Sequence, residues 1–447
     1  MKRTPLLPLP LKKLPAIASL ILLAGLAYAG SLTSAEPSSV GLSSDRLSRI
    51  TAAMESDVAD GRIAGAVGLI ARNGQVAYFE ARGKADRERG IAMRPDTVFR
   101  IYSMSKPITS AALMMLYEEG RFRLSDPVAK YLPELEKVMV LVDKKAAERG
   151  GGSGVGTLLG QREEPEISPD EYELVKPSRA MTVQDLMRHT SGLTYGFSQN
   201  DLVDRMFRKA RLLNFDKTLA EAVVKLGALP LKHQPGTRFE YSVSVDVQGR
   251  LIEVLSGMAL DEFLKQRVFD PLQMTDTGFY VPEPNWDRLA QIYQPLDGGA
   301  KIKARDGELG GRYTKKPALL SGGGGLVSTA SDYLRFCQMM LNGGELDGVR
   351  LLSRKTVELM TIDHLAAAGV KRDGGYGFGL GVAVATDLAR SGLNGSLGEY
   401  NCGAAGTRFW IDPQEKMIGI YMVQILPHDA PLYGDTFKRL AYQAIAD

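Results

Sequence analysis

The chain has 447 residues, of which 44% are hydrophobic and 24% are charged. These values are ordinary for globular proteins and exclude a largely disordered chain, while the length predicts one large two-lobed enzyme or two domains. The formal net charge is +3, but the first 29 residues carry four basic side chains and no acid, so the rest is close to neutral. The charge therefore indicates neither a nucleic-acid partner nor an anionic membrane surface.

Residues 1–29 have the pattern of a secretory signal peptide. A basic segment that ends at Lys13 precedes an apolar run at 14–26, and Ala27-Tyr28-Ala29 supplies a small-x-small cleavage site. We expect cleavage after Ala29 and a periplasmic or secreted protein with no stable membrane anchor. The apolar run is short for a spanning helix, so an uncleaved anchor is the less favoured alternative.

The first predicted elements after this leader are a helix and a hairpin. Residues 45–60 have the apolar spacing of an amphipathic helix. Two strands are predicted over 64–76 and 77–83, around a turn that contains Asn73-Gly74. Asn-Gly between apolar runs is a strong signal for a hairpin.

Helices are predicted in the middle of the chain, and strands return at its end. A helix is expected from Ser103 to Glu119, and 126–260 has a mostly helical pattern with long loops. Two strands follow at 406–411 and 417–424, and a helix is predicted over 433–445. Residues 150–176 are Gly-rich and then acidic, so we expect a mobile surface loop there, either a neutral insertion or a flap over the site.

Strands at both ends with helices between them predict an α/β (α+β) fold. In this fold one antiparallel sheet is built from both termini and flanked by helices, and a mainly helical lobe is inserted. We place a single catalytic domain at 30–447. Its α/β lobe covers about 41–102 and 300–447, and its helical lobe covers about 103–299.

The two cysteines, Cys337 and Cys402, lie far apart in the sequence. An exported protein could join them in a disulfide. Cys337 sits in a helical pattern, however, and we expect it to pack as a small apolar side chain. The disulfide is therefore the less favoured alternative.

Several common enzyme motifs are missing from the sequence. There is no Gly-x-Ser-x-Gly elbow, which argues against an α/β-hydrolase triad. The histidines at 189, 233, 364 and 428 lack the paired spacing of a zinc site. The glycine run 322–325 lacks the Lys that a phosphate-binding loop requires. We therefore expect no metal and no cofactor.

The remaining candidate is a Ser-x-x-Lys motif, Ser103-Met104-Ser105-Lys106, at the start of a predicted helix. Positions i and i+3 lie on one helical face, so the Lys amine can reach the Ser hydroxyl. Burial and the positive end of the helix both favour a neutral amine, which can accept the Ser proton. The motif alone is weak, and a solvated helix N-terminus is the alternative, but apolar residues surround it.

Five segments in a fixed order resemble the β-lactamase-related serine hydrolases. That group includes class C β-lactamases, D-amino-acid peptidases and family VIII carboxylesterases. The segments are the stretch 96–106 around Ser-Met-Ser-Lys, His-Thr-Ser-Gly-Leu at 189–193, Pro-Gly-Thr-Arg-Phe-Glu-Tyr-Ser at 235–242, Gly-Gly-Leu-Val-Ser-Thr-Ala-Ser-Asp at 324–332 and Gly-Ala-Ala-Gly-Thr at 403–407. The resemblance runs from about residue 41 to the end and implies a β-lactamase/penicillin-binding-protein-like fold.

The resemblance implies a catalytic set of Ser103, Lys106 and Tyr241. Ser103 would attack the substrate, Lys106 would take its proton, and Tyr241 would pass a proton to the leaving group. A cationic Lys nearby would favour the Tyr241 phenolate. The backbone N–H groups of Ser103 and of a strand residue near Ala404 would form the oxyanion hole.

Two departures from the family pattern bear on the substrate. The family's Tyr-x-Asn motif is Tyr241-Ser242-Val243 here, and Val243 cannot make the hydrogen bonds of the Asn. No Lys precedes the closing strand, and Arg408 is expected further along it as a solvated residue. The predicted substrate-binding residues are Val243, Tyr102, Asn401 and Gly403.

These losses favour a neutral ester over a β-lactam or a D-Ala-D-Ala peptide. The leading hypothesis is a carboxylesterase that cleaves a small-molecule ester through a Ser103 acyl-enzyme. The first alternative is a β-lactamase, peptidase or amidase that uses the same residues. A non-catalytic cell-wall binding protein is the remote alternative, because a binding module has no use for Ser103, Lys106 and Tyr241 together.

Overall fold

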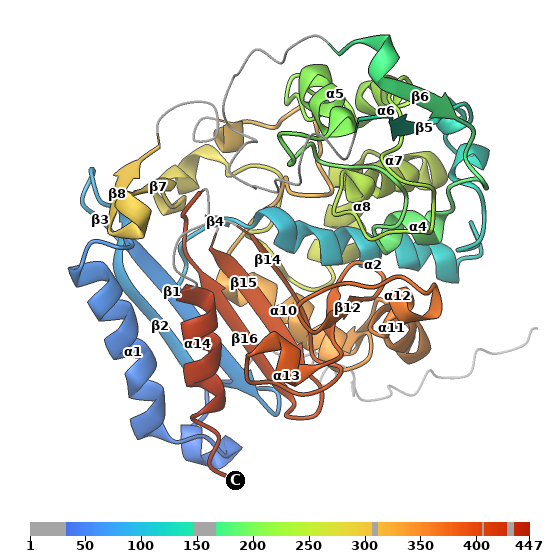
Figure 1. Cartoon of the computed structure of the whole chain (residues 1–447). Coiled ribbons are helices and arrows are strands. Elements are labelled where there is room, and N and C mark those ends of the chain that lie inside the picture. Colours follow the sequence, from blue (N-terminus) through green and yellow to red (C-terminus); the bar gives the residue numbers. More distant parts are fainter. Residues whose placement is uncertain (1–32, 146–166, 306–311, 405, 427–432) are drawn as a thin grey trace, which may run out of the picture. The chain divides into compact units, whose positions relative to one another are not determined.

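The computed structural model describes residues 33–145, 167–305, 312–404, 406–426 and 433–447 (Figure 1). The predicted signal peptide and most of the predicted glycine-rich loop lie outside these ranges. The residues from Leu32 onward group into one compact unit. Among the described residues, no helix has both the length and the apolar character needed to cross a membrane.

The described residues contain an eight-stranded antiparallel sheet in the order β12-β13-β14-β15-β16-β1-β2-β3. At its centre β1 (Gly65–Arg72) pairs with β16 (Met417–Met422), so that Val67 lies opposite Met422. The sheet is therefore built from both ends of the chain, as predicted. The remaining strands are β2 (Gln75–Asp86), β3 (Ile91–Ala92), β12 (Tyr376–Phe378), β13 (Ala383–Ala385), β14 (Tyr400–Ala404) and β15 (Thr407–Asp412).

Both faces of this sheet are buried, and alternate residues point to opposite faces. Leu69 and Ile420 pack into the core cluster that also contains α10 (Ala330–Leu341). Ile70 and Trp410 pack on the other face, in a separate cluster with α1 (Ser44–Ala59) and α14 (Tyr433–Tyr442). Figure 1 shows α1 and α14 side by side across this second face.

The local signals at the chain ends are confirmed. The helix predicted over 45–60 is α1, and the predicted hairpin is β1–β2. Its turn residues Asn73 and Gly74 have φ angles of 55° and 78°, the left-handed pair that a tight antiparallel turn requires. The strands and the helix predicted after residue 405 are β15, β16 and α14.

Helix α2 (Ser105–Glu118) passes through the interior, and its residues from Ser105 to Leu116 are all buried. It packs against α7 (Ser244–Ser256). The prediction of a helix from Ser103 needs a small correction. Ser103 lies in a 3-10 turn, Tyr102–Met104, that leads directly into α2.

Smaller elements surround α2 and α7. The further helices are α4 (Val183–Met187), α5 (Leu202–Ala210), α6 (Leu219–Leu226), α8 (Leu260–Leu264), α11 (Arg354–Met360), α12 (His364–Ala367) and α13 (Leu388–Ser391). The short hairpins and strand pairs are β4 (Phe99–Arg100) with β9 (Val327–Ser328), β5 (Val140–Asp143) with β6 (Tyr172–Val175), β7 (Tyr293–Leu296) with β8 (Lys301–Ala304), and β10 (Glu345–Leu346) with β11 (Val349–Arg350). The lobe boundaries drawn from the sequence remain a prediction.

The structure tests the predictions about the loop at 150–176 and about the two cysteines. The end of the predicted loop 150–176 is not loop, because 172–175 forms β6 and pairs with β5. Both cysteines are unpaired: Cys337 is buried in α10, and Cys402 lies in β14.

Candidate active site

Three side chains that are far apart in the sequence meet at Ser103. Lys106 Nζ lies 3.1 Å from Ser103 Oγ, and the Tyr241 hydroxyl donates to the same oxygen over 2.6 Å. Lys106 comes from the first turn of α2, and Tyr241 comes from the loop just before α7. The predicted set of Ser103, Lys106 and Tyr241 is therefore assembled in space.

Burial controls the charge of Lys106. The side chain is 2% exposed, and burial lowers its pKa to about 8, against smaller opposing effects from Cys402 and Asp246. Nζ also donates to the Gly323 carbonyl over 2.5 Å. A lysine with this pKa is partly neutral in weakly basic solution, and the neutral amine can accept the proton of Ser103.

Tyr241 differs from the sequence prediction in its protonation. Burial raises its pKa well above the usual value, and the Cys402 thiol adds to this increase, while the hydrogen bond to Ser103 opposes it. The prediction that Lys106 would favour the Tyr241 phenolate is wrong for this reason. Tyr241 begins as a phenol that donates to Ser103 Oγ.

Backbone pairing between two loops places Tyr241. Glu240 N–H donates to the His189 carbonyl over 2.8 Å, and Gly236 N–H donates to the Thr190 carbonyl over 2.7 Å. These loops contain the His-Thr-Ser-Gly-Leu and Pro-Gly-Thr-Arg-Phe-Glu-Tyr-Ser segments of the sequence. Their shared function in this structure is to deliver Tyr241 beside Ser103.

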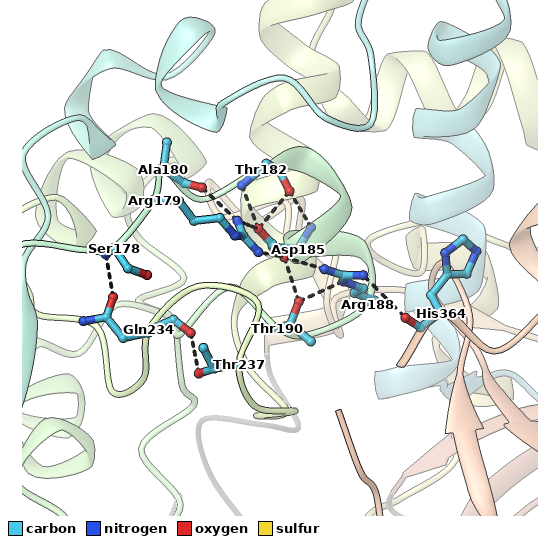
Figure 2. A network of polar contacts seen from close by, with 10 residues as sticks. All are labelled: Ser178, Arg179, Ala180, Thr182, Asp185, Arg188, Thr190, Gln234, Thr237 and His364. Carbon is cyan, nitrogen blue, oxygen red and sulfur yellow. Dashed lines mark hydrogen bonds and ion pairs between the residues drawn. The ribbon is translucent and has the colours of Figure 1, made fainter. Parts of the chain in front are cut away.

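A buried carboxylate fixes the first of these loops to α4, as Figure 2 shows. Asp185 accepts hydrogen bonds from Arg179, Arg188 and Thr190, and from the backbone and hydroxyl of Thr182. Burial alone would raise the Asp185 pKa, but these donors outweigh it and hold the pKa at about 2. The carboxylate is therefore ionised whenever the fold is intact near neutral pH.

An aromatic cluster backs the Tyr241 ring. The His189 ring lies 4.8 Å from the Tyr241 ring and 5.3 Å from the Phe378 ring, measured between centroids. Burial, with Lys106 and Arg372 nearby, lowers the His189 pKa well below its usual value, so the ring is neutral. His189 Nδ1 contacts Ser242 Oγ at 3.2 Å. These contacts make His189 a packing partner of Tyr241.

Strand β14 borders the nucleophile, and its alternation decides which side chains face Ser103. The Cys402 thiol donates to the Ser103 carbonyl over 3.1 Å. Asn401 lies on the opposite face, where its amide contacts Glu399 at 3.4 Å. Ala404, the predicted oxyanion-hole residue, is the last residue of β14, beyond Gly403.

Two other predicted substrate-binding residues are mostly buried. Val243 is 5% exposed and packs in the main core at the start of α7. Tyr102 has a left-handed backbone with φ of 39°, an uncommon conformation next to a nucleophile. Its hydroxyl is buried and has no hydrogen-bond partner among the described residues, and its electrostatic neighbours are Tyr313, Arg100 and Arg305. The roles of Val243 and Tyr102 toward a substrate remain predictions.

Arg372 is a cation close to Cys402 of β14 that the sequence reasoning missed. It precedes β12, donates to the Gly377 carbonyl over 3.0 Å and lies 4.9 Å from the Phe239 ring centroid. Arg408, by contrast, forms an ion pair with Asp435 of α14. The prediction of a solvated Arg408 is therefore wrong, because α14 covers that face of the sheet.

A cavity of about 350 Å³ lies on the α14 side of β14 and β15. Its wall includes Asn401, Arg408, Trp410 and Lys438, and Arg372 borders it. None of the Ser103–Lys106–Tyr241 set lines it, so the candidate active site rests on the hydrogen bonds around Ser103 and not on this cavity. Within the described residues, no group of three or more His, Cys, Asp or Glu side chains gathers as a metal site would require.

Comparison with protein-family models matches residues 50–443 to the family described as beta-lactamase. The chain belongs to the beta-lactamase family. Protein Rv1367c of Mycobacterium tuberculosis is 37% identical over 378 residues, which cover 82% of this chain and 87% of that protein. Esterase EstB of Burkholderia gladioli is 29% identical over 394 residues, or 84% of this chain and 90% of that protein.

Solved structures show the same fold. The structure of EstCE1, a hydrolase with promiscuous acyltransferase activity, has a TM-score of 0.70 at 26% identity and covers 89% of this chain and 99% of that chain. Membership of the beta-lactamase family supports a hydrolase, as does the name of the relative EstB. It also confirms the fold expected from the five sequence segments.

Within this beta-lactamase fold, three neighbours of the Ser103 set carried no sequence signal of their own. Tyr195 lies with its ring 5.5 Å from the Tyr241 ring, two residues beyond the segment that pointed to the family. Asp246 lies in α7 on the Lys106 side. Cys402 was considered for a disulfide and not for the site. A search for acids in the first turn of the helix that follows Tyr241 would have found Asp246.

Proposed function

We propose that the protein is a serine carboxylesterase that works through an acyl-enzyme on Ser103. The observation that carries this proposal is the convergence of Lys106 Nζ and the Tyr241 hydroxyl on Ser103 Oγ, at 3.1 and 2.6 Å. One group can remove the Ser proton, and the other can supply a proton to the leaving group. That division of labour is what acyl transfer to a serine requires.

Acylation begins with a neutral Lys106. Ser103 Oγ–H donates to the amine, Oγ attacks the ester carbonyl carbon, and the proton passes to Nζ as the new C–O bond forms. When the tetrahedral intermediate collapses, Tyr241 gives its phenolic proton to the leaving alkoxide. The Lys106 ammonium, 4.6 Å from the Tyr241 ring centroid, then returns a proton to the phenolate.

Deacylation uses Lys106 and Tyr241 in the same roles. Water loses a proton to the neutral Lys106 and attacks the acyl carbon, and Ser103 Oγ leaves with the proton of Tyr241, which Lys106 restores. We propose the backbone N–H groups of Ser103 and Ala404 as the donors that stabilise both oxyanions. The contact between Cys402 and the Ser103 carbonyl supports this, because it places β14 directly beside the nucleophile turn.

Two observations favour esters over lactams and peptides. Val243 stands where the lactam-cleaving members have an Asn, and its buried apolar side chain cannot hold a substrate amide. The similar proteins include Esterase EstB and Lovastatin esterase of Penicillium rubens, which is 28% identical over 86% of this chain and 95% of that protein. The substrate we propose is a small or medium ester.

The test compares hydrolysis of p-nitrophenyl acetate, butyrate and octanoate with hydrolysis of a chromogenic cephalosporin. Wild type and Ser103→Ala are assayed, and Ser105→Ala is the matched control. Ser105 is a buried serine at the start of α2, two residues after Ser103, and its hydroxyl accepts from Leu326 N–H. We expect ester cleavage in wild type and in the control, and its loss by several orders of magnitude in Ser103→Ala.

Each other outcome has a definite meaning. Faster cleavage of the cephalosporin than of any ester would keep the nucleophile and move the protein to the β-lactamase side. Full activity in Ser103→Ala would remove the mechanism. The absence of turnover and of Ser103 labelling by a fluorophosphonate probe would support a binding protein.

We also propose that the protein is exported and cleaved after Ala29. Support comes from the basic start, the apolar run and the small residues at 27 and 29. Intact-mass measurement of the protein from the periplasm or the culture medium should give a chain that begins at Gly30. A cytoplasmic protein of full mass would overturn this proposal.

A further inference from the structure

The glycine run 322–325 lies under the candidate base. The carbonyl of Gly323 accepts the 2.5 Å hydrogen bond from Lys106 Nζ, and the carbonyl of Gly322 accepts from the Thr109 hydroxyl over 2.9 Å. Lys106 is buried, and among the described residues Ser103 Oγ and this carbonyl are the two hydrogen-bond acceptors of its amine. The position of the turn therefore decides where the amine sits.

The glycines are needed because the turn lies directly against α7. A Cβ atom on Gly322 would lie 2.8 Å from the Val245 carbonyl oxygen, which is backbone and cannot move aside. A Cβ atom on Gly323 would lie 2.6 Å from Asp246 Oδ2. Such distances are too short for carbon, so only glycine permits this approach. The glycine run 322–325, which does not form a phosphate-binding loop, thus has a structural role in packing against α7.

Asp246 of α7 fixes the same turn. Its Oδ1 accepts a hydrogen bond from the Ser321 hydroxyl over 2.5 Å and another from Gly323 N–H over 3.2 Å. The side chain is buried, with the residue 5% exposed. A buried carboxyl with two donors on a turn holds that turn firmly, because any shift would leave its oxygen unpaired.

The groups that face Lys106 come from several elements. The Tyr195 and Tyr241 rings lie 5.2 and 4.6 Å from Nζ, and the neutral His189 lies behind Tyr241. Cys402 approaches from β14, and Asp246 approaches from α7. Among the described residues that act on the charge of Lys106, Asp246 is the one carboxyl group, and it favours the ammonium form.

We propose that Asp246 is a positioning residue for Lys106, which holds the Gly323 carbonyl in place and supplies the negative charge that faces the amine. The inference rests on the proposed function, because it assigns Lys106 the role of base. In addition, Asp246 of α7 helps to determine the pH at which Lys106 loses its proton and becomes a base.

Asp246→Asn separates charge from geometry. The amide oxygen can still accept from Ser321 and Gly323, while the negative charge disappears. Since a carboxylate favours a neighbouring ammonium, its removal lowers the Lys106 pKa. We expect the acid limb of kcat/KM for p-nitrophenyl butyrate to move to lower pH by about one unit. KM should change little, because Asp246 is buried and its hydrogen bonds go to Ser321 and Gly323.

Ser321→Ala is the matched control for geometry. It removes one donor to Asp246 and leaves the charge, so we expect a several-fold fall in kcat without movement of the acid limb. Asp246→Ala removes both effects and should lower kcat further. Circular dichroism and thermal melts check that each variant folds. An unchanged kcat in Ser321→Ala would overturn the positioning role even if Asp246→Asn does not fold.

A second readout does not depend on activity. The ¹³Cε resonance of Lys106, identified by its loss in Lys106→Met, is titrated in wild type and in Asp246→Asn. A lower midpoint in Asp246→Asn supports the inference, and equal midpoints overturn it. If wild type cleaves no ester, the proposed function fails while this titration still decides the role of Asp246. If wild type is an esterase and the midpoints are equal, the inference alone fails.

Discussion

Lys106 lies between the rings of Tyr195 and Tyr241, with its amine 5.2 and 4.6 Å from their centroids. Burial lowers its pKa from 10.5 to about 8. The same burial raises the Tyr241 pKa, so Tyr241 is a phenol, while Lys106 passes from ammonium to amine near pH 8. In both groups burial disfavours the charged form, because a buried charge is costly to desolvate.

This charge state predicts the pH dependence of the reaction. Because the neutral form of Lys106 is the active base, kcat/KM should rise with pH through an apparent pKa of about 8 and fall away in acid. Lys106→Met lacks the amine, so its activity should be lower by about 10²–10⁴-fold and should lose this acid limb. Initial rates with p-nitrophenyl butyrate between pH 6 and 10 check both points. A Lys106→Met variant with the wild-type profile would contradict the assignment.

At the residue scale, the sequence predicted what depends on local spacing or on family motifs. The Ser103–Lys106 contact follows from i, i+3 spacing, and Tyr241 came from the resemblance of its segment. The protonation of Tyr241 could not be predicted, because it depends on burial by residues distant in the sequence. Arg372 was missed for the same reason, since nothing near it in the sequence indicates β14.

Two loops, rather than helices or strands, carry the residues around Tyr241, and Asp185 of α4 holds the first of them. The Asp185 carboxylate is fully buried and receives donors from Arg179 and Arg188. Breaking a buried pair by removing one partner is costly because it leaves the other charge uncompensated. The position of the loop, and with it Tyr241, thus depends on one carboxylate that lies outside the chemistry.

Asp185→Asn should destabilise the protein in a pH-dependent way. The folded-state pKa of about 2 lies below the unfolded value, so the carboxylate contributes stability above about pH 4 that is lost as pH falls toward 2. The shift corresponds to about 2 kcal/mol at neutral pH. Urea unfolding at pH 7, 5, 4 and 3 should show the deficit of Asp185→Asn shrinking below pH 4.

The control for this series is Asp287→Asn, which breaks an exposed ion pair with Arg89. Exposed pairs contribute about 0–1 kcal/mol, so this variant should unfold almost as wild type does. A deficit of Asp185→Asn that stays constant from pH 7 to pH 3 would show that its carboxylate is not the source of the stability.

Elements with strong local signals were predicted well, and elements made by tertiary contact were not. The Asn73-Gly74 turn and the amphipathic spacing of α1 specify those elements within a short stretch of sequence. The strand β6 has a mixed polar pattern and becomes a strand by pairing with β5. Arg408 was expected in solvent because the sequence does not show that α14 returns to cover β15.

At the scale of the whole described unit, the central sheet joins the two ends of the chain, and α14 packs over it. A buried ion pair forms that junction: Lys438 of α14 donates to Glu399 over 2.6 Å, and both side chains are almost inaccessible. Burial raises the Glu399 pKa and lowers the Lys438 pKa. Both directions show that desolvation outweighs the attraction within the pair, so the pair fixes an arrangement rather than adding much stability.

Lys438→Met should therefore be more harmful than the loss of the whole pair. It leaves the buried Glu399 carboxylate without its cation, at a cost of about 3–5 kcal/mol. The double variant Glu399→Gln/Lys438→Met carries no unpaired charge and should recover part of this loss. Urea unfolding at pH 7 compares the two, and equal stability of the single and double variants would contradict the desolvation argument.

The pairing of β1 with β16 also has a consequence for how the protein is made. β1 and the Ser103 turn are synthesised early, whereas β14, β15 and β16 are synthesised last. Until β16 has been made, the edge of β1 that pairs with it stays open. Open edges invite pairing with other chains, so the nascent protein depends on being kept apart from its neighbours during that interval. A product cut short before Tyr400 would carry Ser103, Lys106 and Tyr241 without the strand beside them. The site around Ser103 is therefore complete only after the last strands have been synthesised, and not when Ser103 itself first appears.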